Sequence, residues 1–463
     1  MARAMTFNAH LRATLTLGLP LIGSQLAQFL IQLTDTVMVG WYGVTELAAL
    51  VVAVSLISVL IIFGSGFAFA VMPLVAAAAE RGDAVEVRRV TRMGLWASMG
   101  FCAVTLPPLM ATPDIFLRLN QPADVAGAAW AYLAIAGWGV IPALIMVLMR
   151  SYLSGLERAR IVLWVTLGGV AANAGLNWLL IFGNLGLPEL GIEGAAIASL
   201  GSHAVMAAGL ILYAVRVLPE HALFVRLWRA DREALRSVFR LGWPIGLTNL
   251  AEVGLFAASS ILMGWVGTQA LAAHGIALQL ATATFMVHLG LCQAATVRAG
   301  QAMGRGDVTG LRRAALAAIA LSGGVAALAV VAFLAAPEAL IAPFLDPADP
   351  DRAAIIGVGV GLLAAAALFQ LVDAAQVMAL GLLRGVQDTR VPMLYAAVSY
   401  WGVGAPVAYL LGLHTPLGGV GVWLGLALGL TCAAGFMMHR FWRRAVPRIA
   451  ADAAPTRGIV HGA

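Results

Sequence analysis

Apolar residues fill long runs of this chain, and short breaks made by glycine, proline and charged residues separate the runs. One helix needs about 20 apolar residues to cross the hydrocarbon core of a bilayer. Reading the runs against that length predicts twelve membrane-spanning helices. Their expected limits are residues 12–39, 47–77, 90–111, 124–149, 161–183, 191–215, 237–264, 271–297, 311–336, 353–383, 391–412 and 417–439. We therefore predict an all-α integral membrane protein.

The two halves of the chain resemble each other when the sequence is shifted by 224 residues. Pro20 then aligns with Pro244, and Arg81-Gly82-Asp83 aligns with Arg305-Gly306-Asp307. Agreement at one offset indicates an internal duplication. Six spans in each repeat give both repeats the same orientation, so we expect two six-helix bundles related by a pseudo-two-fold axis along the membrane normal.

The longest polar segment lies between the repeats, at residues 216–236. We interpret it as a linker between an N-terminal lobe of residues 1–215 and a C-terminal lobe of residues 237–445. Residues 446–463 form a predicted cytoplasmic tail. The two lobes are expected to enclose a central cleft.

The composition excludes a water-soluble fold, because 61% of the residues are hydrophobic and 11% are charged, whereas soluble domains carry about 25% charged residues. All 28 basic residues are arginine. If the side of the membrane that carries Arg81, Arg88 and Arg89 faces the cytoplasm, only Arg118 and Arg352 lie on the opposite side. That asymmetry is the positive-inside pattern, which predicts both termini in the cytoplasm. Because the arginines are dispersed over separate segments, the net charge of +6 reflects membrane topology and not a nucleic-acid partner.

Signatures of enzymes and of secreted proteins are missing from the sequence. It contains no HExxH motif, no P-loop and no GxSxG elbow. Its three cysteines lie in separate apolar runs and predict neither a disulfide framework nor a metal cluster. The N-terminus has no short apolar core with a small-residue cleavage site, so we expect the first run to stay attached as the first span. We expect no enzymatic activity and no cofactor.

Three acidic residues, Asp35, Glu252 and Asp373, lie well inside apolar runs. Inserting each costs about 2.5–3.5 kcal/mol. The nearest arginines, Arg150 and Arg384, are expected at cytoplasmic helix ends, out of pairing reach. A proton, an alkali cation or a cationic substrate would then neutralise the acids, which favours cation-coupled transport. The other interpretation is a permanently protonated carboxyl group bonded to a neighbouring helix.

Oxygen-bearing side chains accompany Asp35. Asn173 and Asn177 are spaced i, i+4 and so share one face of the fifth span, and Ser199 lies near the start of the sixth. Such oxygens suit a hard monovalent cation, so the sequence predicts a possible sodium site. The asparagines are equally consistent with hydrogen bonds between helices.

Aromatic residues accompany the acids of the second half. Phe256 follows Glu252 by one turn, and Phe369 precedes Asp373 by one turn. The eighth span adds Gln279 and Phe285. Acids among aromatic rings can bind a lipophilic cation by charge and cation–π attraction. These aromatic residues can also be simple packing or lipid-facing residues.

Five stretches of the chain are distinctive: residues 17–22 (LGLPLI), 33–40 (LTDTVMVG), 244–256 (PIGLTNLAEVGLF), 369–376 (FQLVDAAQ) and 383–390 (LRGVQDTR). They resemble the multidrug and toxic compound extrusion (MATE) family, in its bacterial NorM-like branch. The resemblance implies a monomeric antiporter of the bacterial inner membrane that exports organic cations or fluoroquinolone-like drugs in exchange for sodium ions or protons.

The resemblance also implies roles for individual residues. Asp35, Asn173, Asn177 and Ser199 match the first-lobe cation site of the family. Glu252 and Asp373 match its second-lobe acids. Phe369 is a departure, because some NorM-like members have tyrosine there and its hydroxyl is missing from this chain.

Three other transporter classes remain as alternatives. A lipid-linked oligosaccharide flippase of the same superfamily should line its cleft with basic residues. A passive cation channel would need a repeated selectivity filter. A major-facilitator transporter also has two six-helix halves, but its loop signature is only loosely matched at residues 80–92.

Overall fold

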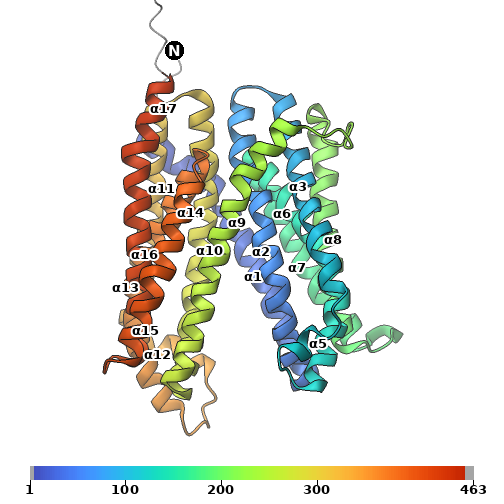
Figure 1. The fold of residues 1–463 in the computed structure, drawn as a ribbon, viewed down its shortest axis with the longest axis vertical. Helices are drawn as coiled ribbons and strands as arrows, with labels where there is room; N and C mark the ends of the chain where they lie inside the picture. Colours follow the sequence, from blue (N-terminus) through green and yellow to red (C-terminus); the bar gives the residue numbers. More distant parts are fainter. Residues whose placement is uncertain (1–4, 454–463) are drawn as a thin grey trace, which may run out of the picture.

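The computed structural model describes residues 5–453, which are almost entirely helical (Figure 1). The N-lobe consists of α1 (Phe7–Tyr42), α2 (Val44–Glu80), α3 (Ala84–Met110), short α4 (Ile115–Arg118), α5 (Ala123–Ala136), α6 (Val140–Gly155), α7 (Ala159–Ile181) and α8 (Gly191–Val217). A 3₁₀ turn at Gly137–Gly139 joins α5 to α6. These two helices make one span of the six in this lobe.

The C-lobe consists of α9 (Arg232–Val266), α10 (Thr268–Arg305), α11 (Val308–Ala335), short α12 (Pro337–Ile341), α13 (Arg352–Gly385), α14 (Arg390–Ala397), α15 (Ala405–Leu413), α16 (Gly418–Arg440) and α17 (Val446–Ala453). π-helical segments at Val398–Gly404 and Phe441–Ala445 connect α14 to α15 and α16 to α17. The described residues therefore contain twelve candidate membrane spans, as predicted. Residues 454–463 of the predicted tail lie outside the described residues.

Most helices extend beyond their predicted limits, because capped polar turns continue the helix past its apolar part. Asp83, Asp231 and Asp307 each accept a hydrogen bond from a backbone N–H three residues further on, at 2.9, 3.1 and 2.7 Å. Such aspartate caps satisfy the free donors of a first helical turn. As a result α9 begins at Arg232, and the segment between α8 and α9 covers only residues 218–231.

The first turns of α9 pack on the N-lobe, although the rest of the helix belongs to the C-lobe. Val238, Leu241 and Ile245 belong to a hydrophobic core formed otherwise by N-lobe helices. Further along, Leu255 and Leu262 belong to the C-lobe core. In Figure 1, α9 accordingly starts beside the N-lobe and runs across to the C-lobe.

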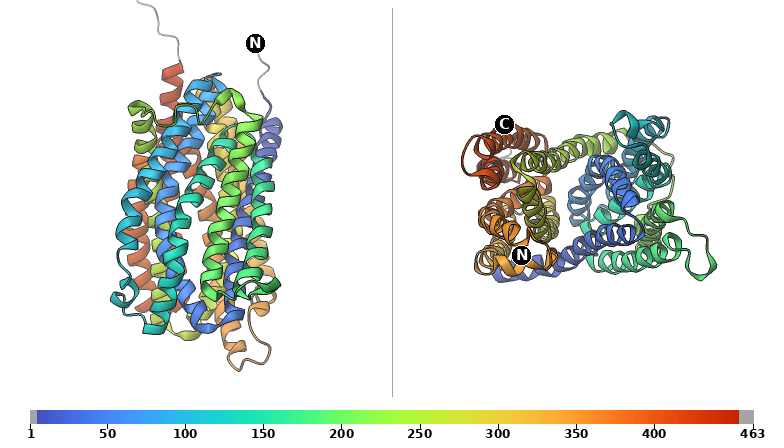
Figure 2. Two further views of the ribbon diagram at one scale, coloured as in Figure 1. Left: turned by 90° about the vertical axis from the view of Figure 1, so that its right-hand side faces the viewer. Right: turned by 90° about the horizontal axis from the view of Figure 1, so that it is seen from below.

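The two lobes form two separate groups of helices, with α1 along one edge and α9 along the other (Figure 2). The first residues of α1, the linker and α17 lie at one end of the molecule, here called the terminal end (Figure 1). The helices of the two lobes diverge toward the other end.

Glycines bring α9 close to α2, and α10 close to α1. The backbone of α2 at Gly66 touches the backbone of α9 at Gly242 and Gly246, so that a methyl group added to Gly66 would overlap both. A Cβ atom on Gly290 of α10 would lie 2.6 Å from Ile22 Cα of α1. Small residues of this kind let membrane helices approach closely.

Polar contacts join the lobes at the terminal end. Arg305 Nη1 of α10 lies 2.8 Å from Glu80 Oε1 of α2. Gln301 Nε2 donates to Glu157 Oε1, which follows α6, at 3.0 Å. The structure is therefore closed between the lobes at this end.

Candidate functional site

Asp35 of α1 accepts three hydrogen bonds from the neighbouring helices of the N-lobe. Asn173 Nδ2 and Asn177 Nδ2 of α7 donate to its Oδ1 at 2.9 and 2.6 Å. Ser199 Oγ of α8 donates to its Oδ2 at 2.9 Å. The structure thus brings together all four residues of the predicted first-lobe site.

The two asparagines turn their amide nitrogens, and not their oxygens, toward Asp35. Asn177 Nδ2 also lies 3.3 Å from Asn173 Oδ1, and Asn177 Oδ1 is buried without a hydrogen-bond partner among the described residues. In this arrangement protein donors alone stabilise the Asp35 carboxylate. A bound cation would require the amides to rotate so that their oxygens face it.

A pocket of about 260 Å³ adjoins Asp35 within the N-lobe. Its polar lining includes Gln28, Gln32, Tyr132 and His203. His203 Nδ1 lies 2.8 Å from the Ser199 carbonyl oxygen. Tyr132 could not be predicted as a site residue, because only the packing of α5 against α8 places it beside this site.

Arg150 is buried in the N-lobe, which corrects the prediction that it lies at a helix end. Its side chain is 3% exposed. Its Nη1 donates to Gln25 Oε1 and Gln28 Oε1 at 2.7 and 2.6 Å, and its guanidinium lies over the Phe69 ring. Arg150 forms no ion pair with Asp35, because α1 offers it neutral amides.

Glu252 of α9 and Asp373 of α13 are buried in the C-lobe at 7% and 1% exposure. They are close enough for the charge of Glu252 to act on Asp373. Glu252 Oε1 and both carboxylate oxygens of Asp373 have no hydrogen-bond partner among the described residues. Leaving buried oxygens without partners costs about 1–3 kcal/mol each, and more when the group is charged.

Further polar groups surround these acids. Gln376 of α13 donates through Nε2 to the Tyr400 hydroxyl at 2.6 Å, and the charges of Glu252 and Asp373 both act on that hydroxyl. Tyr400 lies in the π-helical segment 398–404, a type of irregularity that is frequent at functional sites. Gln370 is fully buried and both of its amide atoms lack partners in the described chain. Tyr400, Gln376 and Gln370 were not among the predicted site residues.

Arg384 lies in the last turn of α13, at the helix end as predicted, and its side chain extends inward. Its Nη2 donates to Asn249 Oδ1, one turn before Glu252, at 2.7 Å. Its charge acts on Glu252. No arginine forms an ion pair with Asp35, Glu252 or Asp373 within residues 5–453.

The predicted aromatic residues pack mainly against each other. Phe369 is buried in the C-lobe core and contacts the edges of Phe256 and Trp423, with ring centroids 5.8 and 5.4 Å apart. Phe285 packs partly buried against the same core. Gln279 is exposed and makes no side-chain hydrogen bond within residues 5–453. The structure thus groups Phe256 with Phe369, and it does not bring Gln279 into that group.

The family profile described as MatE matches residues 20–179 and 244–410. The two matches begin at Pro20 and Pro244, the pair of prolines that defined the internal repeat. They cover well over half of the chain.

Curated relatives and solved structures give the same result. The chain is 48% identical to the "Probable multidrug resistance protein NorM" of Rhizobium meliloti, over 94% of this chain and 93% of the relative. It is 45% identical to the protein of that name from Agrobacterium fabrum, over 94% of both chains. A structure titled "Outward-facing conformation of a multidrug resistance MATE family transporter of the MOP superfamily" superposes with a TM-score of 0.84 at 21% identity, covering 98% of this chain and 100% of that one.

The profile, the relatives and the fold agree along nearly the whole length of the chain. They describe a multi-pass membrane transporter and not an enzyme. The chain therefore belongs to the multidrug and toxic compound extrusion (MATE) family.

Proposed function

We propose that this protein exports organic cations and drugs, including fluoroquinolone-like compounds, across the bacterial inner membrane in exchange for sodium ions or protons. The observation that carries the proposal is the state of Asp373, which is buried beside Glu252 with both carboxylate oxygens unpartnered. The relatives named as multidrug resistance proteins support export of drugs.

The C-lobe acids supply the chemistry of exchange. A buried carboxylate without a protein partner is stabilised by a proton, by a metal cation or by a cationic substrate. If these ligands compete for the same negative charge, arrival of the coupling ion lowers the affinity for the drug, and the drug lowers the affinity for the ion by the same factor. The Tyr400 hydroxyl supplies an oxygen near both acids, in place of the one that Phe369 lacks.

The Asp35 site serves as a second coupling site in this mechanism. Rotation of the Asn173 and Asn177 amides would present their oxygens to a sodium ion beside the carboxylate. Protonation of Asp35 would instead disrupt the hydrogen bonds that its carboxylate accepts from Asn173, Asn177 and Ser199. Either event changes the packing of α1 against α7, the helices that carry these residues.

The arginines give the orientation. They are concentrated at the terminal end, so we place this end in the cytoplasm by the positive-inside rule. The lobe contacts of Arg305 and Gln301 then close the cytoplasmic side. Export requires these contacts to open so that drug can enter from inside.

The residues that surround the buried acids do not support the flippase alternative. A large anionic headgroup would favour a basic lining, whereas no arginine lines the pocket beside Asp35. A passive channel would need a repeated filter, and the acids are not repeated between the lobes.

Ethidium efflux from proteoliposomes, driven by a sodium or a proton gradient applied separately, tests the proposal. We expect one of the two gradients to drive accumulation by the wild type and neither to do so for Asp373→Asn. Glu338→Gln is the matched control, because Glu338 is an exposed acid on α12. Ethidium movement that depends on neither the sodium gradient nor the proton gradient would contradict antiport.

A further inference from the structure

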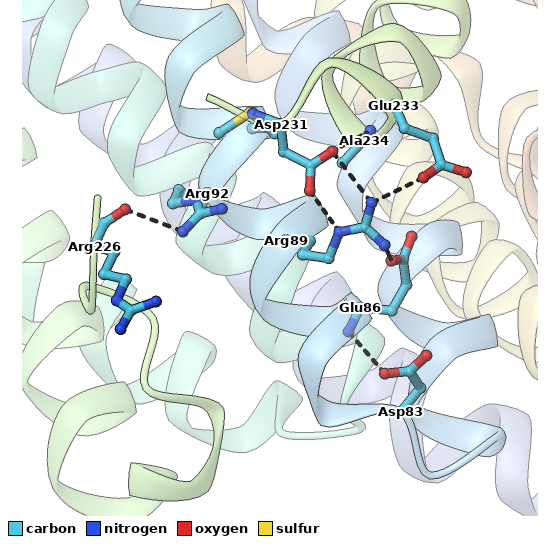
Figure 3. A network of polar contacts seen from close by, with 9 residues as sticks. Asp83, Glu86, Arg89, Arg92, Arg226, Asp231, Glu233 and Ala234 are labelled. Atoms are coloured by element: carbon cyan, nitrogen blue, oxygen red, sulfur yellow. Dashed lines mark hydrogen bonds and ion pairs between the residues drawn. The ribbon is translucent and has the colours of Figure 1, made fainter. Parts of the chain in front are cut away.

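A second pocket, of about 600 Å³, lies at the terminal end between α3 and the linker between the lobes. Figure 3 shows part of its wall. Its arginines come from two stretches that are far apart in the sequence: Arg88, Arg89 and Arg92 of α3, and Arg226, Arg229 and Arg232 of residues 225–232. The proposed drug transport makes no use of this pocket.

The only carboxylate in the described lining of this pocket is already occupied. Arg89 donates to both oxygens of Asp231, through Nε at 2.5 Å and Nη2 at 3.2 Å. Arg89 also pairs with Glu86 and Glu233, each at 2.9 Å (Figure 3). Arg89 therefore forms ion pairs with three acids. The other five arginines of the pocket have no ion pair within residues 5–453.

Arg92 provides an independent sign of an anion site. Its side chain is 7% exposed, and its Nη1 donates to the Arg226 carbonyl oxygen at 3.1 Å. Its Nε is buried without a partner among the described residues. A buried guanidinium with an unused N–H on the wall of a basic pocket is stabilised by an anion that accepts from it.

Exposed aromatic residues place the pocket at the membrane surface. Trp228 of the linker is 78% exposed, and Phe224 and Trp96 are also exposed. Trp96 Nε1 donates to the Leu227 carbonyl oxygen at 2.8 Å, which fixes the linker against α3. Amphipathic rings of this kind concentrate at the level of lipid headgroups.

We propose that this pocket binds a phosphate-bearing anion, and that the headgroup of an anionic phospholipid is its source. Basic pockets at cytoplasmic helix ends attract the anionic lipids of the inner leaflet. The arginine fork matches two oxygens of a phosphate group. The rings of Phe224 and Trp228 would then contact the start of the acyl chains.

Arg92 has no counterpart in the second repeat. At the repeat offset of 224 residues, Arg88 corresponds to Arg312 but Arg92 corresponds to Leu316. Arg312 is therefore a natural control, since it lies at the equivalent position of α11 without the arginine that follows one turn later in α3.

The test is equilibrium binding of a fluorescent phosphatidylglycerol to the full-length, delipidated protein in a neutral detergent. Unlabelled phosphatidylglycerol, phosphatidylcholine and inorganic phosphate serve as competitors. The variants are Arg92→Gln and the double change Arg226→Gln with Arg229→Gln, which alters exposed residues and so does not threaten folding. The control is Arg81→Gln with Arg312→Gln, which removes the same charge at exposed positions outside the pocket.

We expect the double pocket variant to weaken lipid binding by about tenfold or more, because it removes two charges that attract the anionic headgroup, and the control to change it less than about twofold. Competition by phosphatidylglycerol and not by phosphatidylcholine supports the lipid source. Competition by inorganic phosphate at millimolar concentration supports phosphate binding from a soluble source. Equal binding by wild type and the double variant, or an equal loss in the control, overturns the proposal.

Discussion

An arginine from the fourth span of each repeat reaches the same two positions of the first span. In the N-lobe, Arg150 contacts Gln25 and Gln28. At the repeat offset these glutamines correspond to Asn249 and Glu252. In the C-lobe, Arg384 contacts Asn249 and acts on Glu252.

The scaffold is therefore duplicated while the charge on it is not. In the N-lobe the arginine is bonded to neutral amides, and the acid lies further along α1 at Asp35, where three donors satisfy it. In the C-lobe the charge of Arg384 acts on Glu252. Both carboxylate oxygens of the neighbouring Asp373 lack a hydrogen-bond donor among the described residues. The comparison suggests that the N-lobe holds a charge in a preformed site, whereas the C-lobe keeps acids that need an incoming ligand.

The largest effect is expected from Asp35→Asn. The substitution removes the charge that Asn173, Asn177 and Ser199 now stabilise, so we expect gradient-driven ethidium export to be abolished while the protein stays folded and inserted. Vesicle efflux and size-exclusion chromatography measure the two properties. Asp114→Asn, which changes an exposed acid, is the control. Undiminished export by Asp35→Asn would mean that this site is purely structural.

Glu252→Gln and Asp373→Asn should weaken equilibrium binding of ethidium by more than about tenfold, within the usual range of coupling between sites. Each removes part of the negative charge for which drug and coupling ion compete. A neutral substrate should bind nearly as before. Binding by fluorescence across sodium concentration and pH measures the effect. If both variants keep the affinity and ion dependence of the wild type, the unsatisfied C-lobe acids have no part in exchange.

Arg384→Gln and Arg150→Gln compare the two inward-reaching arginines directly. Removing Arg384 takes a positive charge away from Glu252, so the affinity for a cation should rise several-fold. Removing Arg150 should leave that affinity unchanged, because its partners are neutral. The same binding measurement compares the cation affinities of the two variants. Equal changes in affinity would show that the two arginines do not act differently on the bound cation.

The smallest effect concerns Asp231, outside the membrane spans. Its hydrogen bonds from Arg89 lower the pKa of the Asp231 carboxyl to about 2, below the usual 3.8. Because the folded pKa lies below the unfolded one, this contact stabilises the fold above about pH 4 and its contribution disappears as the pH falls through about 2. Thermal unfolding of wild type and Asp231→Asn should therefore differ by a constant amount from pH 5 to 8.

If the stability difference between the wild type and Asp231→Asn changed near neutral pH, that result would contradict the lowered pKa of Asp231. A constant difference would mean that any pH dependence of transport near neutrality arises elsewhere, which sharpens the contrast between the buried acids and this surface carboxylate.

The spans and the shared face of the two asparagines could be predicted because their signals are local in the sequence. Asp35 lies more than a hundred residues from its partners, and it was grouped with them by its polar character inside an apolar run and by the family resemblance. Apolar length marks each span, and the i, i+4 spacing of Asn173 and Asn177 already places them on one face. The roles of Tyr400 and Gln376 could not be predicted in this way. Lipid is as apolar as the helix interfaces, so hydropathy does not reveal which side of a membrane helix faces its neighbours.

Arg150 was misplaced for a related reason. It was expected at a helix end, but α6 continues to Gly155, and amide oxygens in the lobe interior accept from its buried side chain. Arg384 lies at the end of α13 as predicted, and its long side chain extends inward to Asn249. The basic pocket also escaped prediction, because its arginines come from segments more than a hundred residues apart.

The glycine contacts between α2 and α9 have a consequence for how the closed side opens. At Gly66, Gly242 and Gly246 the two backbones touch, and Leu241 and Ile245 of α9 are buried in the N-lobe core beside them. The first turns of α9 should therefore move with the N-lobe when the lobes separate. Opening then breaks the polar contacts between α10 and the N-lobe, such as the pair of Glu80 with Arg305, which water can replace as the two residues part.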